Sequence, residues 1–343
     1  MAYTADSKSA AREGLWVQVP LPAYSFTSTM NNLLFAIGTV LPVFLMIAVG
    51  YTIRKKGFVS AGFCETAARF NFRLCLPALV FDSLYSSDIS RLFSGRLALL
   101  SLASVTVSLA LASATGFAAA KDPGTRASFI QGAFRGNIIL LGMPMVVQVF
   151  GEDSRAQTAI LMAIIVPAYN VFSVIILALG AKGSGTLGPR AIAKSVLTNP
   201  MILGVLAALP FALAGLALPA PIMVFIRYFA GMTVPLALVD IGSGMVGRSR
   251  LSHPGRVLAA AALKTAATPF IYGAIFVFGG MEGHIVALMV LLGATPTAMA
   301  SFTMAKVMGC EAELSGDIVM ASTLMSAFTI SGAIIVLRAI GLA

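Results

Sequence analysis

A few charged and amide side chains occur inside otherwise apolar stretches, and these residues could do chemistry. Arg135 and Asn137 lie two residues apart near the middle of one stretch, and Lys264 lies inside another. A cation in an apolar medium is costly and is usually functional. Arg135 could pair with an anionic ligand, with the Asn137 amide as a second donor, or it could be the structural partner of an aspartate. Lys264 raises the same question.

Two aspartates, Asp82 and Asp240, also lie inside apolar stretches, each five residues after a proline. They could bind a coupling cation or a proton, latch two moving parts through Arg or Lys, or form half of a structural ion pair. Paired intramembrane carboxylates are also typical of aspartyl proteases, where they share a proton. No Gly-x-Gly-Asp motif precedes either aspartate, so the protease interpretation is remote.

Other catalytic or metal-binding patterns are not evident in the sequence. Cys64, Cys75 and Cys310 are far apart and form no C-x-x-C pair. The two histidines, His253 and His284, fall in predicted loops, so no nucleophilic triad is indicated. We therefore expect no metal, no cofactor and no enzymatic activity.

Two apolar stretches contain Gly and Pro near their centres. One includes Gly136 and Pro144, and the other includes the pair Thr295 and Pro296. Proline removes a backbone donor and clashes with the preceding helical turn. Two such interrupted helices predict a crossing point, where half-helix N-termini present free N–H groups to an anion. Ordinary proline kinks are the alternative.

The composition requires a membrane around these stretches. The 343-residue chain is 58% hydrophobic and only 10% charged, whereas soluble domains are roughly 25% charged. The net charge of +10 would suggest nucleic acid in a soluble protein. Here Lys and Arg lie mainly in short loops between apolar runs, so we expect lipid and no nucleic acid as partner.

A span needs about 20 mostly apolar residues, and the chain has ten such stretches. They lie near 33–53, 63–86, 97–119, 127–150, 156–180, 197–217, 221–246, 257–279, 285–308 and 316–340. The predicted organisation is an N-terminal tail (1–30), a first five-helix repeat (31–180), a linker (181–195) and a second repeat (196–343).

The two halves align without gaps at an offset of 158 residues. This offset places Asp82 on Asp240 and Asn137 on Thr295, and it aligns two pairs of prolines. Each half contains five spans, an odd number, so the second half enters the membrane in the opposite orientation. Inverted repeats of this kind are typical of secondary transporters. The sequence therefore predicts an all-α membrane protein whose broken helices 4 and 9 cross.

Basic residues set the predicted orientation, because they mark the cytoplasmic side. One set of loops holds most of them: Arg54, Lys55, Lys56, Lys121, Arg126, Lys182, Arg190, Lys194, Arg248, Arg250 and Arg256. The opposite set holds mainly Arg91, Arg96 and Arg155. Both termini are therefore predicted to be non-cytoplasmic, with the protein in the inner (plasma) membrane.

The chain resembles the auxin efflux carrier family, which includes plant auxin carriers and bacterial permeases for malonate and malate. The resemblance rests on LPVFLMIAVGY, LCLPALVFDSL and GNIILLGMPMVVQVFG in the first half, and on LTNPMILG and TVPLALVDIGSG in the second. It implies a ten-helix fold similar to bile acid sodium symporters and an elevator movement of a transport domain. Spans one, two, six and seven would form the scaffold, often at a dimer interface. Asn137, Pro144 and Pro296 would lie at the substrate crossing.

Together these patterns predict a secondary transporter of a small organic anion, a carboxylate such as malonate or another dicarboxylate. Substrate-binding candidates are Arg135, Gly136, Asn137, Pro144, Thr295 and Pro296, and coupling or gating candidates are Asp82, Asp240 and Lys264. The coupling ion would be a proton or sodium, and the protein would be a homodimer. The alternatives are a cation-coupled symporter of a bile-acid-type amphipathic anion and a passive channel.

Overall fold

The computed structural model describes residues 26–86, 94–181, 190, 194, 197–247 and 251–342, with side chains described from residue 41 onward. Most of the predicted tail and most of the predicted linker lie outside these residues, as do Arg248 and Arg250. The first helix begins at Phe26, inside the predicted tail. No Gly or Pro separates Phe26 from the apolar stretch, so the helix extends farther back than its apolar part.

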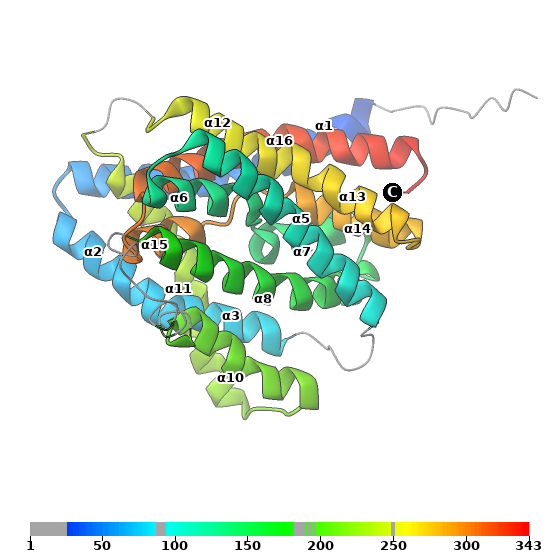
Figure 1. The fold of residues 1–343 in the computed structure, drawn as a ribbon, viewed down its shortest axis with the longest axis horizontal. Helices are drawn as coiled ribbons and strands as arrows, with labels where there is room; N and C mark the ends of the chain where they lie inside the picture. The colour runs from blue at the N-terminus through cyan, green and yellow to red at the C-terminus, as the bar shows by residue number, and fades with distance from the viewer. Residues whose placement is uncertain are drawn as a thin grey trace, which may run out of the picture.

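The described chain is mostly helical, with several helices divided by short π-helical turns (η) (Figure 1). The first half contains α1 (Phe26–Lys55), α2 (Ala61–Phe70), η1 (Asn71–Cys75), α3 (Leu76–Tyr85), α5 (Gly95–Ala119), α6 (Pro123–Phe134), η2 (Ile138–Gly142), α7 (Met143–Phe150) and α8 (Ser154–Gly180). The second half contains α10 (Pro200–Ala214), α11 (Ala220–Gly244), α12 (Pro254–Ala262), η4 (Leu263–Ala267), α13 (Thr268–Phe278), α14 (Gly283–Ala294), α15 (Ala300–Val307) and α16 (Ala312–Ala339).

Five helical segments are long and apolar enough to cross a membrane. They are Gly95–Ala119, Ser154–Gly180, Ala220–Gly244, Pro254–Phe278 and Ala312–Ala339. Shorter apolar helices accompany them, and large apolar side chains such as Phe278, Phe270 and Phe328 are exposed on the surface. Water would not favour such a surface, whereas lipid covers it at no cost. The architecture is that of a multi-pass membrane protein.

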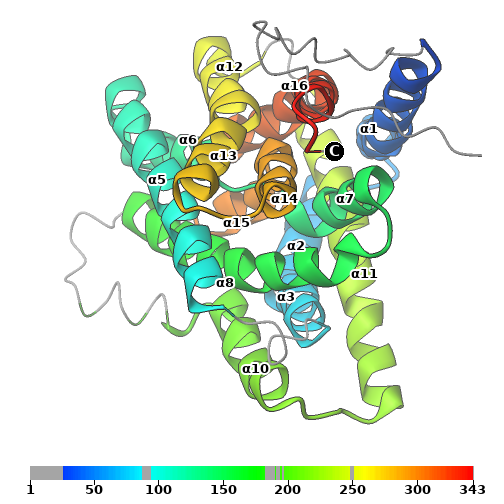
Figure 2. The same cartoon turned by 90° about the vertical axis from the view of Figure 1, so that its right-hand side faces the viewer.

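The helices pack into two groups (Figures 1 and 2). In the first group, α1 packs against α11, and α3 packs against both α10 and α11. In the second group, α5 packs against α6, α8 and α13, while α12, α14 and α15 pack against α16. The largest apolar cluster lies within the second group, and two smaller clusters contain residues of both groups.

Helices α1 and α11 approach so closely that side chains are excluded from their contact. A Cβ atom on Gly242 would lie 2.9 Å from the backbone nitrogen of Tyr51 and would overlap the carbonyl of Ile47. A Cβ on Gly50 would likewise meet the backbone of Val239. Small residues permit this kind of close backbone approach between membrane helices.

Candidate functional site

Two breaks in the helices meet at the centre of the molecule. One lies between α6 and η2, at residues 135–137, and the other lies between α14 and α15, at residues 295–299. The Asn137 N–H donates to the Pro296 carbonyl over 2.7 Å, and the Ala298 N–H donates to the Arg135 carbonyl over 3.0 Å. Non-helical backbone at membrane depth persists only where its polar groups are satisfied within the protein. These two hydrogen bonds satisfy part of that requirement.

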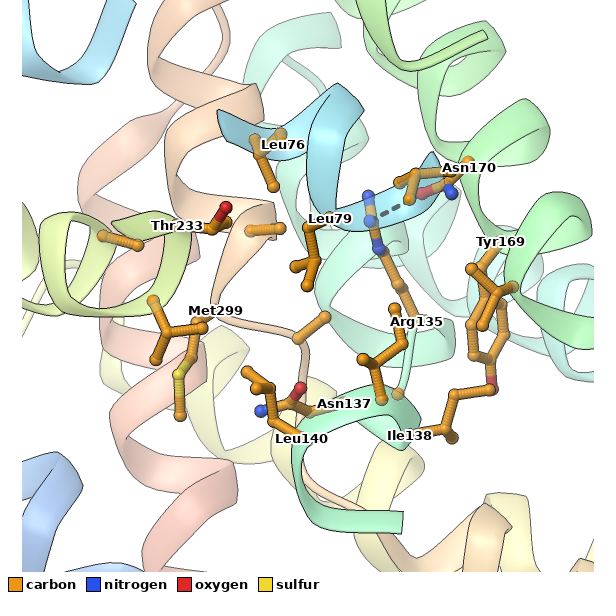
Figure 3. Close-up of a pocket in the computed structure, with 18 of the residues that line it drawn as sticks. Leu76, Leu79, Arg135, Asn137, Ile138, Leu140, Tyr169, Asn170, Thr233 and Met299 are labelled. Atoms are coloured by element: carbon orange, nitrogen blue, oxygen red, sulfur yellow. Dashed lines mark hydrogen bonds between the residues drawn. The ribbon is translucent and has the colours of Figure 1, made fainter. Parts of the chain in front are cut away.

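A cavity lies beside the two breaks, between the two groups of helices (Figure 3). The second group contributes Arg135, Asn137 and Asn170, and the first group contributes Leu79 from α3 and Thr233 from α11. Its free space is about 40 Å³, enough for a few water molecules because one water needs about 10–15 Å³. A larger ligand requires the two groups to move apart.

Arg135 lines this cavity and is only 6% exposed. One guanidinium nitrogen donates to the Asn170 Oδ1 over 2.8 Å, and another lies against the sulfur of Met304. Among the described residues, no carboxylate forms an ion pair with it. It therefore does not pair with Asp82 or Asp240, which was the structural alternative from the sequence. A thioether is a weak acceptor, so the guanidinium keeps unused capacity for an anion.

Several donors around the cavity also lack a protein partner. The amide nitrogens of Asn137 and Asn170 and the hydroxyl of Thr233 are buried without a hydrogen bond. Buried polar groups are normally paired, because an unpaired one costs about 1–3 kcal/mol. A carboxylate offers only acceptors and would satisfy the two amides and the guanidinium together.

Asn170 and Thr233 were not among the residues singled out from the sequence. Each is a polar residue inside a predicted span, and this was the one feature of the sequence that could have indicated a role at the cavity. Their helices, α8 and α11, are distant in sequence from the break at 135–137. Only the packing brings these side chains to the cavity.

The other predicted binding residues lie near the crossing in different roles. Gly136 lines the cavity, and Pro296 contributes its carbonyl to the backbone pairing. The Thr295 hydroxyl is turned back and donates to the Leu292 carbonyl over 2.7 Å, so it does not face the cavity. Pro144 lies at the start of α7, directly after the π-helical turn η2, and is not part of the break. Proline is tolerated inside membrane helices where a local π-helical adjustment accommodates the lost backbone hydrogen bond.

The two repeated aspartates form separate ion pairs. Asp240 is buried and accepts from the ammonium of Lys306 over 2.5 Å, which joins α11 to α15. Asp82 accepts from Arg227 over 3.0 Å, which joins α3 to α11. Arg227 and Asp240 are thirteen residues apart on one helix, about 20 Å. The two carboxylates therefore cannot share a proton, which argues against the protease alternative.

The Asp240–Lys306 pair links the two helix groups. We expect the two residues of this pair to be strongly coupled to each other in their effect on stability. A double-mutant cycle of Asp240→Asn and Lys306→Gln, measured by chemical unfolding in mixed micelles, should give a coupling energy of about 1–3 kcal/mol. Removing one partner leaves a buried charge uncompensated, which is costly. The exposed Glu152–Arg155 pair serves as the matched control and should show no measurable coupling. Equal coupling in both cycles would contradict this prediction.

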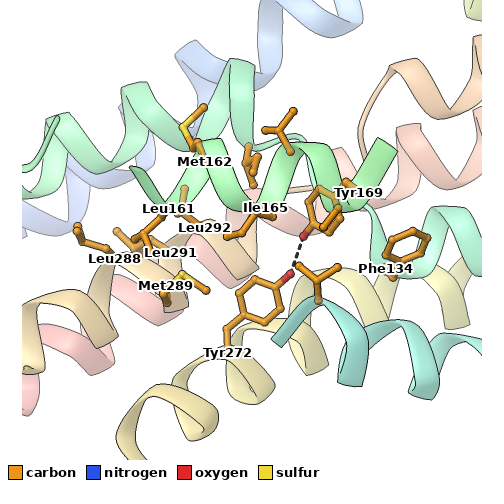
Figure 4. Close-up of a cluster of buried hydrophobic side chains, with 14 of the residues drawn as sticks. Phe134, Leu161, Met162, Ile165, Tyr169, Tyr272, Leu288, Met289, Leu291 and Leu292 are labelled. Atoms are coloured by element: carbon orange, nitrogen blue, oxygen red, sulfur yellow. Dashed lines mark hydrogen bonds between the residues drawn. The ribbon is translucent and has the colours of Figure 1, made fainter. Parts of the chain in front are cut away.

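Lys264 lies in the π-helical turn η4 and is fully buried. Its ammonium donates to the Gly293 carbonyl over 2.6 Å, at the C-terminal end of α14. Close by, the hydroxyls of Tyr169 and Tyr272 bond to each other over 2.8 Å within the large apolar cluster (Figure 4). The first contact joins η4 to α14, and the second joins α8 to α13.

The described cysteines are all free. Cys310 lies in the connection between α15 and α16, and burial raises the pKa of its thiol to about 12, with the nearby Asp122 and Glu311 adding to the effect. This thiol therefore remains protonated at neutral pH and reacts slowly, because the thiolate is the nucleophile. Among the described residues, no group of His, Cys, Asp and Glu is arranged to hold a metal ion.

Comparison with known proteins agrees with this architecture. Residues 35–334 match the family of membrane transport proteins. The chain is 25% identical over 309 residues to a protein of Rhizobium meliloti (strain 1021) named "Putative malonate transporter", covering 88% of this chain and 95% of that protein. It is 23% identical over 295 residues to an "Uncharacterized transporter" of Methanothermobacter thermautotrophicus, covering 84% and 92% respectively.

Proposed function

Because the chain belongs to the membrane transport protein family, the auxin efflux carrier family that its motifs resemble, we propose that it is a secondary transporter of a small organic anion. It is a transport protein rather than an enzyme. The observation that carries the choice of substrate is Arg135, a buried cation that lines the central cavity without an ion-pair partner among the described carboxylates. The anion is a carboxylate.

The chemistry of the cavity supports a carboxylate. A guanidinium binds a carboxylate through two parallel hydrogen bonds, which gives both strength and orientation. The free amide nitrogens of Asn137 and Asn170 supply two further donors, and the α15 N-terminus lies beside the cavity. Helix N-termini favour anions through the partial positive charge of the helix dipole. The malonate named for the Rhizobium relative is a small substrate of this class.

The small size of the cavity supports a transport cycle with moving parts. Its 40 Å³ leave no room for a carboxylate with its methylene group, so binding requires the helix groups to separate. In our proposal, the group of α1, α2, α3, α10 and α11 is a scaffold, and the remaining helices form a transport domain that moves as an elevator. The Asp240–Lys306 pair joins the two bodies and would have to break during that movement.

The proposed topology follows from the helices and the loop charges. We group the helices into ten spans arranged as two inverted five-helix repeats, 31–180 and 196–343, with the breaks at 135–137 and 295–299 in corresponding spans. The basic loops face the cytoplasm, which places both termini on the other side of the inner membrane. A homodimer through the scaffold and coupling to a proton or sodium complete the proposal.

Transport by purified protein in liposomes tests this function. Liposomes loaded with malonate and diluted into labelled malonate should accumulate label above that seen in protein-free liposomes, and the accumulation should saturate. Malate, succinate and an aromatic monocarboxylate define the substrate range when added as competitors. Folded protein that exchanges none of these carboxylates would overturn the proposal, whereas flux without saturation or counterflow would indicate a channel.

A further inference from the structure

A second buried basic residue, Lys264, lies next to Gly136 at the crossing. Lys264 is completely buried, and its ammonium donates to the Gly293 carbonyl. A Cβ atom on Gly136 would lie 2.9 Å from the Cε and 3.3 Å from the Nζ of Lys264. The absence of a side chain at Gly136 is what allows the Lys264 amine to come this close to the non-helical segment that carries Arg135 and Asn137.

The positive charge of Lys264 is only partly compensated. No salt bridge joins it to a carboxylate in the part of the chain that the structure describes. Among the described residues, its hydrogen bond goes to a carbonyl at the C-terminal end of α14, and such an end carries roughly half a negative charge. The buried Asp240 already pairs with Lys306, and the buried Asp317 accepts from Ser252, before α12.

With the amine of Lys264 protonated, Arg135 and Lys264 place two positive charges next to Gly136 in the interior of a membrane protein. We propose that Lys264 sets the charge of the transported anion, so that the pair of cations selects a dianion over a monoanion of the same size. The inference rests on the proposed function. A dianion leaves the site nearly neutral, whereas a monoanion leaves one buried charge uncompensated, and in a medium of low dielectric constant that difference is large.

Lys264 acts through its charge and not by touching the substrate. It is absent from the lining of the cavity, where Arg135 and the amides of Asn137 and Asn170 supply the direct contacts. Its role is therefore separable from that of a ligand-contacting residue. A glutamine at position 264 keeps a donor for the Gly293 carbonyl and removes only the charge, while an arginine keeps the charge.

The test compares malonate with malonamate, in which an amide replaces one carboxylate at nearly the same size. Counterflow rates for both are measured in liposomes with the unaltered protein, Lys264→Gln, Lys264→Arg and, as a control, Lys121→Gln, which removes an exposed lysine. The unaltered protein should prefer malonate by at least about tenfold, and Lys264→Gln should lower that ratio by about tenfold. Lys264→Arg and Lys121→Gln should keep it.

An unchanged malonate-to-malonamate rate ratio in Lys264→Gln would overturn the inference. The hydrogen bond to Gly293 alone would then explain the role of Lys264. A ratio near one in the unaltered protein would overturn it as well, and this measurement carries the test alone if the variant does not fold. Absence of exchange with any carboxylate would instead contradict the proposed function. Failure of this inference can therefore be distinguished from failure of the proposed function.

Discussion

Replacing Arg135 by glutamine is expected to lower malonate exchange by at least about a hundredfold, because truncating one partner of a buried charge pair costs roughly 2–5 kcal/mol. The variant removes the cation that lines the cavity and keeps one amide donor on a side chain two bonds shorter. It also leaves the Asn170 Oδ1 without its present donor. The rate is measured by counterflow at a malonate concentration well below saturation, where loss of affinity is fully visible.

Two further variants separate charge from geometry. Arg155→Gln removes an arginine that is exposed and paired with Glu152 at the start of α8, and exchange should stay within about twofold of the unaltered rate. Arg135→Lys keeps the charge without the planar pair of donors, so an intermediate rate is expected. Full activity of Arg135→Gln would show that the guanidinium does not bind the substrate.

The contact between α1 and α11 gives the largest expected effect on stability. In Gly242→Ala, the new methyl group would overlap the backbone carbonyl of Ile47, and neither helix can yield without moving as a whole. Overpacking costs about 1–3 kcal/mol where side chains can adjust, and more is expected against backbone. The melting temperature in detergent should fall by at least about 10 °C, or the protein should fail to purify as a single species.

A glycine on the same helix provides the control. Gly231 lies in α11 with no atom within 4 Å of an added Cβ, so Gly231→Ala meets open space. Alanine favours a helix over glycine by about 1 kcal/mol, so this variant should melt at an unchanged or slightly higher temperature. The same Gly-to-Ala substitution at two positions of one helix is thus expected to lower the melting temperature at Gly242 and not to lower it at Gly231. Equal melting temperatures would mean that α1 and α11 do not meet closely at Gly242.

The sequence predicts the all-helical membrane architecture and five of its spans because apolar length is a direct physical requirement. The stretches near 97–119, 156–180, 221–246, 257–279 and 316–340 correspond to the five segments long enough to span a membrane. The two breaks were also expected from their glycines and prolines. Their exact position was not, since Pro144 lies inside a helix and the break occurs at residues 135–137.

The candidate site was predictable in part. Arg135 was singled out because a cation inside an apolar stretch is expensive, and it does line the cavity. Thr295 aligns with Asn137 in the repeat but turns its hydroxyl to its own helix. Asn170 and Thr233 could not be assigned, because their position depends on how distant helices pack.

The repeat also concealed an asymmetry between its two aspartates. Asp82 and Asp240 align, yet Asp240 pairs with Lys306, and the residue that aligns with Lys306 in the first half is Gln148. Asp82 pairs instead with Arg227, within the first helix group. Positions that align in the sequence therefore carry different electrostatic roles. Only one of the two pairs joins the helix groups that we propose to move.

Direct binding of labelled malonate to purified protein tests the central claim most directly, because it does not depend on coupling, direction or turnover. Equilibrium dialysis in detergent should show saturable binding to the unaltered protein and to Arg155→Gln, and loss of that binding in Arg135→Gln with an unchanged melting temperature. Equal binding to the unaltered protein and to folded Arg135→Gln would contradict the assignment of the crossing as the carboxylate site.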